Sequence, residues 1–139
     1  MSGPVYAIKT HVKDTRAHTF TFAAQKTMYG GKKIAGGDPI FIFDSENEGG
    51  SGLIARGVVK SVKAIPLNPD AERQTPRVSI TVQRTALARR RLGRAELKPF
   101  SAWDDGRPET ELNFKYYRQA TNKIVGITEE TARFLARFF

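Results

Sequence analysis

Apolar and polar residues alternate along most of the first two-thirds of the chain, and this pattern predicts β-strands there. The clearest case is residues 77–84, where three β-branched residues share one face and polar residues share the other. Residues 5–8 and 19–22 predict two shorter strands. Residues 40–43 form an unbroken apolar run, which is typical of a strand that is buried on both faces.

Three further patterns complete the outline of the fold. Residues 53–65 form a long apolar–polar segment with Gly57 in its middle, where a strand of a small barrel bends sharply. Residues 85–97 are rich in Ala, Leu and Arg, which predicts a short helix interrupted near Gly93. Thr128 precedes two glutamates and an apolar stripe, so we expect it to cap a C-terminal helix.

These elements fit one domain over residues 1–139, because two domains in a chain of 139 residues would each be marginal. We expect an α+β fold, a strongly curved, mixed β-barrel of about five or six strands with one or two peripheral helices. The chain has no apolar run of roughly 20 residues and no basic, apolar leader pattern at its start. We therefore expect no membrane span and a cytoplasmic location.

The net charge of the chain indicates a polyanionic partner. The chain has 23 Lys and Arg against 14 Asp and Glu, a formal net charge of +9. Cations gather in residues 84–98, where Glu96 is the single acid. Its arginines are too close together to pair with Glu96 alone, so we expect them to contact the phosphates of RNA or DNA. The alternative is a solvated basic face that only keeps the protein dispersed.

Residue types that carry catalysis are scarce. The chain has no Cys, and its two histidines, His11 and His18, lack the partners of a metal site or a hydrolytic triad. The glycine-rich residues 49–52 lack the Lys-Ser/Thr of a phosphate-binding loop. We therefore expect a binding module without metal or cofactor, and not an enzyme.

Two segments favour nucleic-acid binding. Residues 28–33, with the sequence M-Y-G-G-K-K, place Tyr29 beside two cations, Lys32 and Lys33. This composition suits stacking on a base and contact with phosphate, although a surface turn with a core Tyr has the same composition. Trp103, the only Trp, lies in a loop where it either covers a pocket or caps the barrel core.

Several segments together resemble EVE domains. Residues 37–45, G-D-P-I-F-I-F-D-S, resemble the G-D-x-(apolar)-F-Y-x-S turn and strand of that family, and residues 52–59 resemble its next strand. Residues 96–98, E-L-K, resemble the segment before its final loop. Residues 117–130 resemble its R-Q-S-R-L-S-V-x-P-(V/I)-T-x-E-E ending and are the most specific match. The resemblance covers roughly residues 36–139.

The resemblance implies a small PUA-like barrel, related to YTH and ASCH domains, that binds nucleic acid and holds a flipped, often modified base in a pocket. Barrel mouths favour such pockets. The expected base pocket comprises Tyr29, Phe43, Asp44, Ser45, Trp103, Tyr117 and Gln119. The expected phosphate contacts are Lys32, Lys33, Arg89, Arg90, Arg91, Arg94 and Arg118.

The chain also departs from the EVE pattern. Residues 29–33, Y-G-G-K-K, stand where EVE domains have W-x-G-V-R-N-Y, and the G-K-K segment equally resembles ASCH domains, some of which are hydrolases. The second hypothesis is therefore a small ASCH-like hydrolase acting on RNA or a modified nucleoside. Lys32 or Lys33, together with Glu46 or Glu48, would be its acid–base candidates. The choice of RNA or DNA, the base and the oligomeric state stay open.

Overall fold

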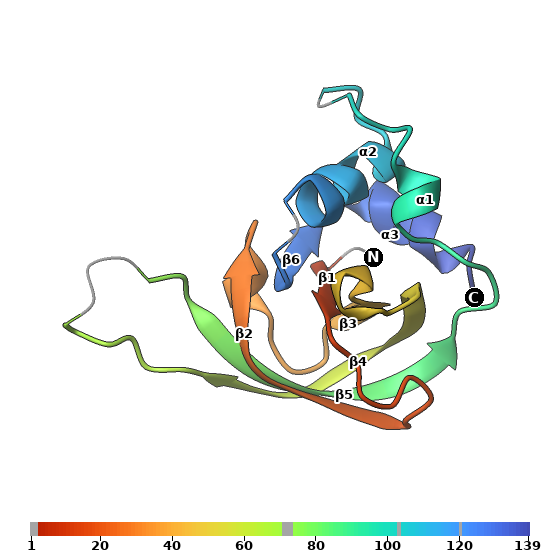
Figure 1. Ribbon diagram of the computed structural model, residues 1–139. Helices are drawn as coiled ribbons and strands as arrows, with labels where there is room; N and C mark the ends of the chain where they lie inside the picture. Colours follow the sequence, from red (N-terminus) through yellow and green to blue (C-terminus); the bar gives the residue numbers. More distant parts are fainter. Residues whose placement is uncertain (1–2, 71–73, 103, 120) are drawn as a thin grey trace.

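The computed structural model describes residues 3–70, 74–102, 104–119 and 121–139. Figure 1 shows a curved sheet closed on itself, with the helices gathered over one side and a long hairpin projecting from the other. The strands are β1 (Val5–Thr10), β2 (Thr19–Met28), β3 (Pro39–Asp44), β4 (Gly52–Ala64), β5 (Arg77–Leu87) and β6 (Lys123–Ile127). The barrel order is β1-β3-β4-β5-β2-β6.

The barrel is mixed. β1 pairs in parallel with β3 and β2 pairs in parallel with β6, while the other neighbours are antiparallel. Its curvature has local causes in the two long strands. The register of β4 against β5 shifts at Gly57, where an added Cβ would lie 2.3 Å from the carbonyl oxygen of Gln83. β2 carries a second shift between Phe22 and Gln25. Such bulges bend and twist a strand, which allows six strands to close.

The helices form one layer over the barrel. They are α1 (Arg94–Leu97), α2 (Pro108–Leu112), the π-helix η3 (Asn113–Arg118) and α3 (Glu129–Ala136), with short 3₁₀ turns η1 (Gly31–Lys33) and η2 (Glu46–Glu48). Thr128 caps α3 as expected, since its hydroxyl accepts a hydrogen bond from the amide of Thr131. The predicted helix over residues 85–97 is wrong in its first half. There β5 continues to Leu87, because pairing with β4 outweighs the helix propensity of Ala and Leu.

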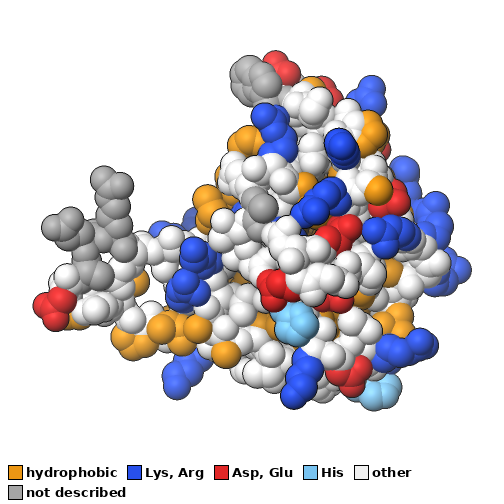
Figure 2. Space-filling model, viewed as in Figure 1, with side chains coloured by type: hydrophobic (Ala, Val, Ile, Leu, Met, Phe, Trp, Pro, Cys, Tyr) orange, Lys and Arg blue, Asp and Glu red, His pale blue; other side chains and the backbone are white. Residues whose placement is uncertain are grey.

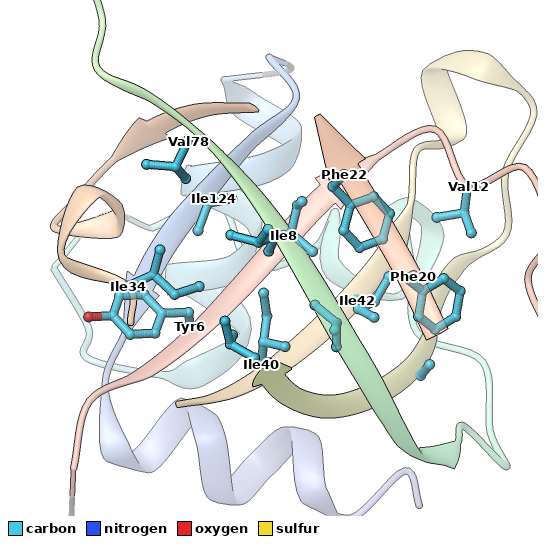
Figure 3. Close-up of a cluster of buried hydrophobic side chains, with 14 residues drawn as sticks. Tyr6, Ile8, Val12, Phe20, Phe22, Ile34, Ile40, Ile42, Val78 and Ile124 are labelled. Atoms are coloured by element: carbon cyan, nitrogen blue, oxygen red, sulfur yellow. The ribbon is translucent and has the colours of Figure 1, made fainter. Parts of the chain in front are cut away.

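The barrel wall separates two hydrophobic clusters. Alternate residues of β1 and β3 point inward, and Ile8, Ile40 and Ile42 meet there in the barrel interior (Figure 3). The residues between them point outward and are covered by the helix layer, where Phe41 and Phe43 pack. Strands covered on both faces are expected to be apolar throughout, as the unbroken run in residues 40–43 predicts.

The predicted fold class is confirmed: a small, curved α+β barrel with peripheral helices, mixed in its strand directions. No helix within the described ranges is long and apolar enough to cross a membrane.

Candidate nucleic-acid interface

A polar cavity of about 380 Å³ opens where β6 begins, between the end of β1 and the bulge of β2. We call it the mouth pocket. Its lining residues are Thr10, Ala24, Gln25, Lys26, Asn47, Glu48, Arg77, Thr121 and Asn122. The volume lies in the range of about 300–1,000 Å³ that is usual for small-molecule sites. The lining is rich in amides, hydroxyls and charges, so it can read a polar edge.

Asn122 lines the mouth pocket and carries a buried hydrogen-bond acceptor without a partner among the described residues. Its side-chain Nδ2 donates to Oε1 of Glu48 at 2.6 Å, and this contact orients the amide because the carboxylate would repel Oδ1. The Oδ1 atom is buried and has no hydrogen-bond partner among the described residues. A buried acceptor without a partner is costly, and a ligand that donates to it removes that cost.

Two cations flank the mouth pocket on the side of β2. The β2 bulge turns the backbone at Ala24 to a φ of 50°, and its carbonyl accepts a hydrogen bond of 2.7 Å from Nη1 of Arg77. Arg77 pairs in register with Lys26 of β2. The half-buried Lys26 and the exposed Arg77 therefore stand side by side at the pocket edge. Figure 2 shows positive side chains in the notch between the projecting hairpin and the body.

The opposite wall, η2, is held in place by the arginine-rich segment. Glu46 accepts hydrogen bonds from Nη2 of Arg91 at 3.2 Å and from the amide of Arg94 at 2.8 Å. Nη2 of Arg94 also donates to Oδ1 of Asn47 at 2.6 Å. Arg91 makes a further ion pair with Glu96. The premise that Glu96 is the only acid near these arginines is wrong, because folding brings Glu46 to them from about 45 residues away.

Two buried lysines lie behind the mouth pocket. Lys9 and Lys123 pair in register across β1 and β6, and both side chains are fully buried. Nζ of Lys9 donates to the carbonyl of Tyr116 at 2.7 Å, and Nζ of Lys123 donates to the carbonyls of Gln119 and Thr121. Burial lowers the pKa of each lysine to about 8, assisted by Arg94 for Lys9 and by Lys9 for Lys123. They fix the chain leading into Asn122.

Three predicted pocket residues lie under the pocket and not in it. Phe43 is fully buried and packs its ring 5.4 Å from that of Tyr116, so its predicted contact with a base is corrected to a core role. The physical reason is strand alternation, which turns Phe43 toward the helices. Asp44 accepts a hydrogen bond from the amide of Val12, which ties the loop after β1. Ser45 is fully buried, and its Oγ has no partner within the described segments.

Tyr29 and Gln119 come together beside η3. The Tyr29 hydroxyl donates to Oε1 of Gln119 at 2.7 Å, and its ring stands under Nζ of Lys115 and at an edge to Phe114. Tyr29 is 40% exposed, so its ring is accessible to a ligand. Neither residue is among those that line the mouth pocket. Tyr29 and Gln119 therefore form a second surface, which we call the Tyr29 ledge.

The remaining predicted base-pocket residues are Tyr117 and Trp103. Tyr117 lies between cations, with its ring 5.3 Å from Nζ of Lys9 and 5.6 Å from the guanidinium of Arg94. Burial and the nearby Glu46 carboxylate raise the pKa of Tyr117. The structure makes this ring part of the support behind η2. Trp103 lies outside the described residues.

The predicted phosphate contacts are exposed but scattered. Lys32 and Lys33 lie on η1 and Arg118 ends η3, where its guanidinium donates to the carbonyl of Ser101. Arg89 and Arg90 donate to carbonyls of the C-terminal segment, at Phe139 and Arg137 respectively. The structure records no hydrogen bond or ion pair of Lys32 or Lys33 with the glutamates of η2 in the part of the chain that it describes. It therefore does not assemble the acid–base pair of the hydrolase hypothesis.

A larger cavity of about 720 Å³ lies between α2, η3 and α3. Glu111 lies at this site, and both of its oxygens are already bound, to Lys115, Thr128 and Thr131. Burial works to raise the pKa of Glu111, but the hydrogen bonds from Lys115 and Thr131 outweigh it and lower the pKa. Because none of the described residues that line this cavity has a buried side-chain acceptor or donor without a partner, the smaller mouth pocket is the better candidate site.

Sequence reasoning missed the placement of Glu48 and Asn122 in the lining of the mouth pocket and of Lys9 and Lys123 behind it. The available signal was an isolated Lys at the end of an apolar strand, in residues 5–10, where an exposed face is not expected. Within the described ranges, no group of three or more His, Asp or Glu could hold a metal ion.

Comparison with known proteins finds the same fold among solved structures. No family model matches the chain, and no curated protein matches it either. Human thymocyte nuclear protein 1, solved in complex with 5-methylcytosine-containing DNA, has 15% identity and a TM-score of 0.64, over 97% of this chain and 96% of that chain. A Pseudomonas putida protein gives 15% identity and a TM-score of 0.64, over 96% and 98%.

A second structure, of the DUF55 domain of human thymocyte nuclear protein 1, is similar at 15% identity and a TM-score of 0.63, over 95% of this chain and 96% of that chain. These likenesses span nearly the whole of each chain, so they concern the complete barrel and its helix layer. They confirm the fold, a small curved barrel with peripheral helices, that the sequence motifs implied.

Proposed function

We propose that this protein is a nucleic-acid-binding module that holds a single base, modified or unmodified, in the mouth pocket. The observation that carries the proposal is a polar cavity lined by Lys26, Arg77 and Asn122, in which the buried Oδ1 of Asn122 has no hydrogen-bond partner among the described residues. The edge of a base donates hydrogen bonds to such an acceptor, and the adjacent cations neutralise the phosphates of the nucleic-acid backbone. The similarity in fold to a human protein solved with 5-methylcytosine-containing DNA supports this choice of ligand.

The orientation of Asn122 favours a class of base. We infer that Asn122, a lining residue of the pocket, turns its unpartnered Oδ1 toward the bound base, where it would accept a hydrogen bond from an exocyclic amino group of cytosine, 5-methylcytosine or adenine, whereas thymine and uracil present a carbonyl in its place. A carbonyl against Oδ1 leaves two acceptors facing each other. The amide therefore selects amino-bearing bases over keto-bearing ones.

The binding function and the hydrolase hypothesis differ in what they need. Hydrolysis needs an activated group that touches substrate, and the two lysines with a lowered pKa, Lys9 and Lys123, are fully buried and bound to backbone carbonyls. Lys32 and Lys33 are exposed on η1, away from the residues that line the mouth pocket. These placements favour binding without turnover.

Titration of labelled oligonucleotides that differ at one central base tests the proposal. Fluorescence anisotropy at one fixed salt concentration compares single strands of DNA and RNA carrying cytosine, 5-methylcytosine, adenine, thymine or uracil. We expect wild type to bind amino-bearing bases more tightly, by about tenfold for one well-placed hydrogen bond. Asn122→Ala is expected to bind all bases alike.

Gln119→Ala is the matched control, because it removes an amide of the same chemistry from the Tyr29 ledge and not from the mouth pocket. It is expected to retain base preference. A loss of preference in Gln119→Ala with none in Asn122→Ala would move the site to the ledge. Absence of binding to every oligonucleotide at low salt would refute the function itself.

A further inference from the structure

The β4–β5 hairpin continues past the barrel as an arm, here defined by its described residues 60–70 and 74–77. Figure 1 shows it projecting from the side opposite the C-terminus. Its base is fixed on both sides. The amide of Ile65 donates to the carbonyl of Arg77, while the amide and hydroxyl of Thr27 in β2 both donate to the carbonyl of Pro76. The arm therefore leaves the barrel in a defined direction.

Leu67 is an exposed apolar side chain on this arm. It is 59% exposed, more than any other large hydrophobic side chain in the described parts of the chain. Pro66 and Pro69 restrict the backbone around it. The loop closes just beyond it, because the amide of Asn68 donates to the side chain of Gln74, which donates back to the carbonyl of Asn68. An apolar group is thus held out in water on a constrained stem.

Leu67 also lies next to the mouth pocket. It lines a groove of about 320 Å³ together with Ile65 and Pro66. Lys26 and Arg77 line this groove and the mouth pocket as well, so the two cavities share one wall of cations. Single exposed hydrophobic residues are common on protein surfaces. This one differs because two cations, Lys26 and Arg77, connect its groove to the mouth pocket.

We propose that Leu67 is an apolar wedge that enters a nucleic-acid duplex at the gap left by the base held in the mouth pocket. This inference rests on the proposed function and adds that the substrate is double-stranded. A base inside a duplex reaches such a pocket only after it leaves the stack, and an apolar side chain inserted into the stack offsets that cost. Lys26 and Arg77, between pocket and wedge, would contact the phosphates of the extruded nucleotide.

The charges of the arm suit this partner. Its described residues carry Lys60, Lys63 and Arg77 against one carboxylate, Asp70, which lies beyond Leu67 toward the tip. A polyanionic duplex is therefore the occupant that the arm fits.

Three DNA probes of one sequence test the wedge: a single strand, a matched duplex, and a duplex in which the target 5-methylcytosine is mismatched. Leu67→Ala is expected to lower affinity for the matched duplex about tenfold or more, to affect the mismatched duplex less, and to leave the single strand unchanged. Only the matched duplex demands full extrusion. Leu67→Met keeps an apolar side chain of similar length and is expected to bind all three probes like wild type.

Met28→Ala is the control for removal of an exposed apolar group elsewhere, since Met28 is 39% exposed at the end of β2. It should leave all three affinities unchanged. Three results would overturn the wedge and leave the proposed function standing. Leu67→Ala could weaken binding to single strand and duplex equally, or it could affect neither. Wild type could also bind single strands alone. Failure of wild type to bind any probe would overturn both.

Discussion

At the scale of single residues, the buried pair Lys9 and Lys123 shows how the site is supported. Two ammonium groups on adjacent strands repel each other and lose water, and both effects lower the pKa of a lysine. They are retained because η3 is a π-helix, whose widened turn and following segment present the carbonyls of Tyr116 and Gln119 to them. The lysines thus connect the barrel wall to the chain that carries Asn122.

The lysine pair predicts an unusual dependence of stability on pH. The pKa of each lysine is about 8 when folded and near 10.5 when unfolded, so the unfolded state binds more protons between these values. The free energy of unfolding therefore rises with pH from about 8 upward, by at most roughly 1.4 kcal/mol per pH unit for each lysine. Urea denaturation at pH 7.0 and pH 9.5 measures it. Both measurements stay below pH 10 for one reason. Burial raises the pKa of Tyr116 above that of the unfolded chain, so the ionisation of this tyrosine changes the free energy of unfolding only at higher pH.

Lys123→Met is the matched variant for this measurement. It removes one charge at similar volume and relieves the repulsion on Lys9, so the rise between pH 7.0 and pH 9.5 should shrink. A wild-type protein whose stability is flat or falls over this interval would contradict the assignment.

At the scale of elements, the helix layer is joined by one carboxylate. Glu111 in α2 accepts hydrogen bonds from Lys115 in η3 at 2.7 Å, from Thr128 at the cap of α3 at 2.8 Å, and from Thr131 inside α3 at 2.5 Å. Three helical elements therefore share one partly buried acceptor. Since η3 leads into Asn122, the position of the mouth pocket depends on this junction.

Replacing Glu111 tests the junction. Glu111→Ala leaves Lys115 partly buried without its carboxylate, and we expect a decrease of about 3 kcal/mol in the free energy of unfolding. Because the pKa of Glu111 is lowered on folding, its contribution is present above about pH 4.5 and is lost as the pH falls through the folded pKa. Chemical denaturation at pH 7 and pH 4 measures both effects.

Glu129→Ala provides the comparison at the same helix layer. The Glu129–Arg133 pair has the same four-residue spacing as Glu111–Lys115 but is well exposed, so its removal should cost about 0.5 kcal/mol or less. Equal decreases in the two variants would show that burial and the threonine contacts add nothing.

At the scale of the whole molecule, the chain carries a net charge of +9, and Lys and Arg side chains lie at several places on the face that Figure 2 shows. Arg77 lies at the start of β5 beside Lys26 of β2, whereas Arg89 to Arg91 follow the end of β5, about 30 Å farther along an eleven-residue strand. The arginine-rich segment reaches the mouth pocket through η2 instead. Its guanidinium groups both stabilise η2 and remain exposed to a polyanion.

Changing the charge of this segment separates its two roles. Arg89, Arg90 and Arg91 replaced together by Gln should weaken binding to all sequences alike. The slope of log affinity against log salt should flatten by roughly 0.7 for each phosphate of a single strand that is no longer neutralised. Replacement of the same three by Lys keeps the charge but removes the geometry that Arg91 offers to Glu46. It should preserve the slope, and titrations over a series of salt concentrations compare the variants.

An unchanged slope in the Gln variant would identify these arginines as structural supports of η2 and the C-terminal segment. A flattened slope in the Lys variant would show that geometry and not charge governs the interaction. Either result would refute the expectation that this segment neutralises phosphates.

The sequence by itself determined the barrel and most of its strands. Alternation in residues 77–84, the double-sided apolar run in residues 40–43 and the bend at Gly57 depend on local side-chain period and on the missing Cβ of glycine, and all three are found. The cap at Thr128 is equally local. The helix over residues 85–97 failed where pairing with β4 outweighed local propensity.

Only the tertiary structure decided which side chains share a site. The groups of the mouth pocket come from β1, β2, η2, β5 and the start of β6, and the Glu48–Asn122 contact joins residues 74 positions apart. Strand alternation turned Phe43 into the core, and folding gave Arg91 a partner in Glu46. Such facts depend on strand order and register, which closure of the whole barrel sets and no short stretch of sequence encodes.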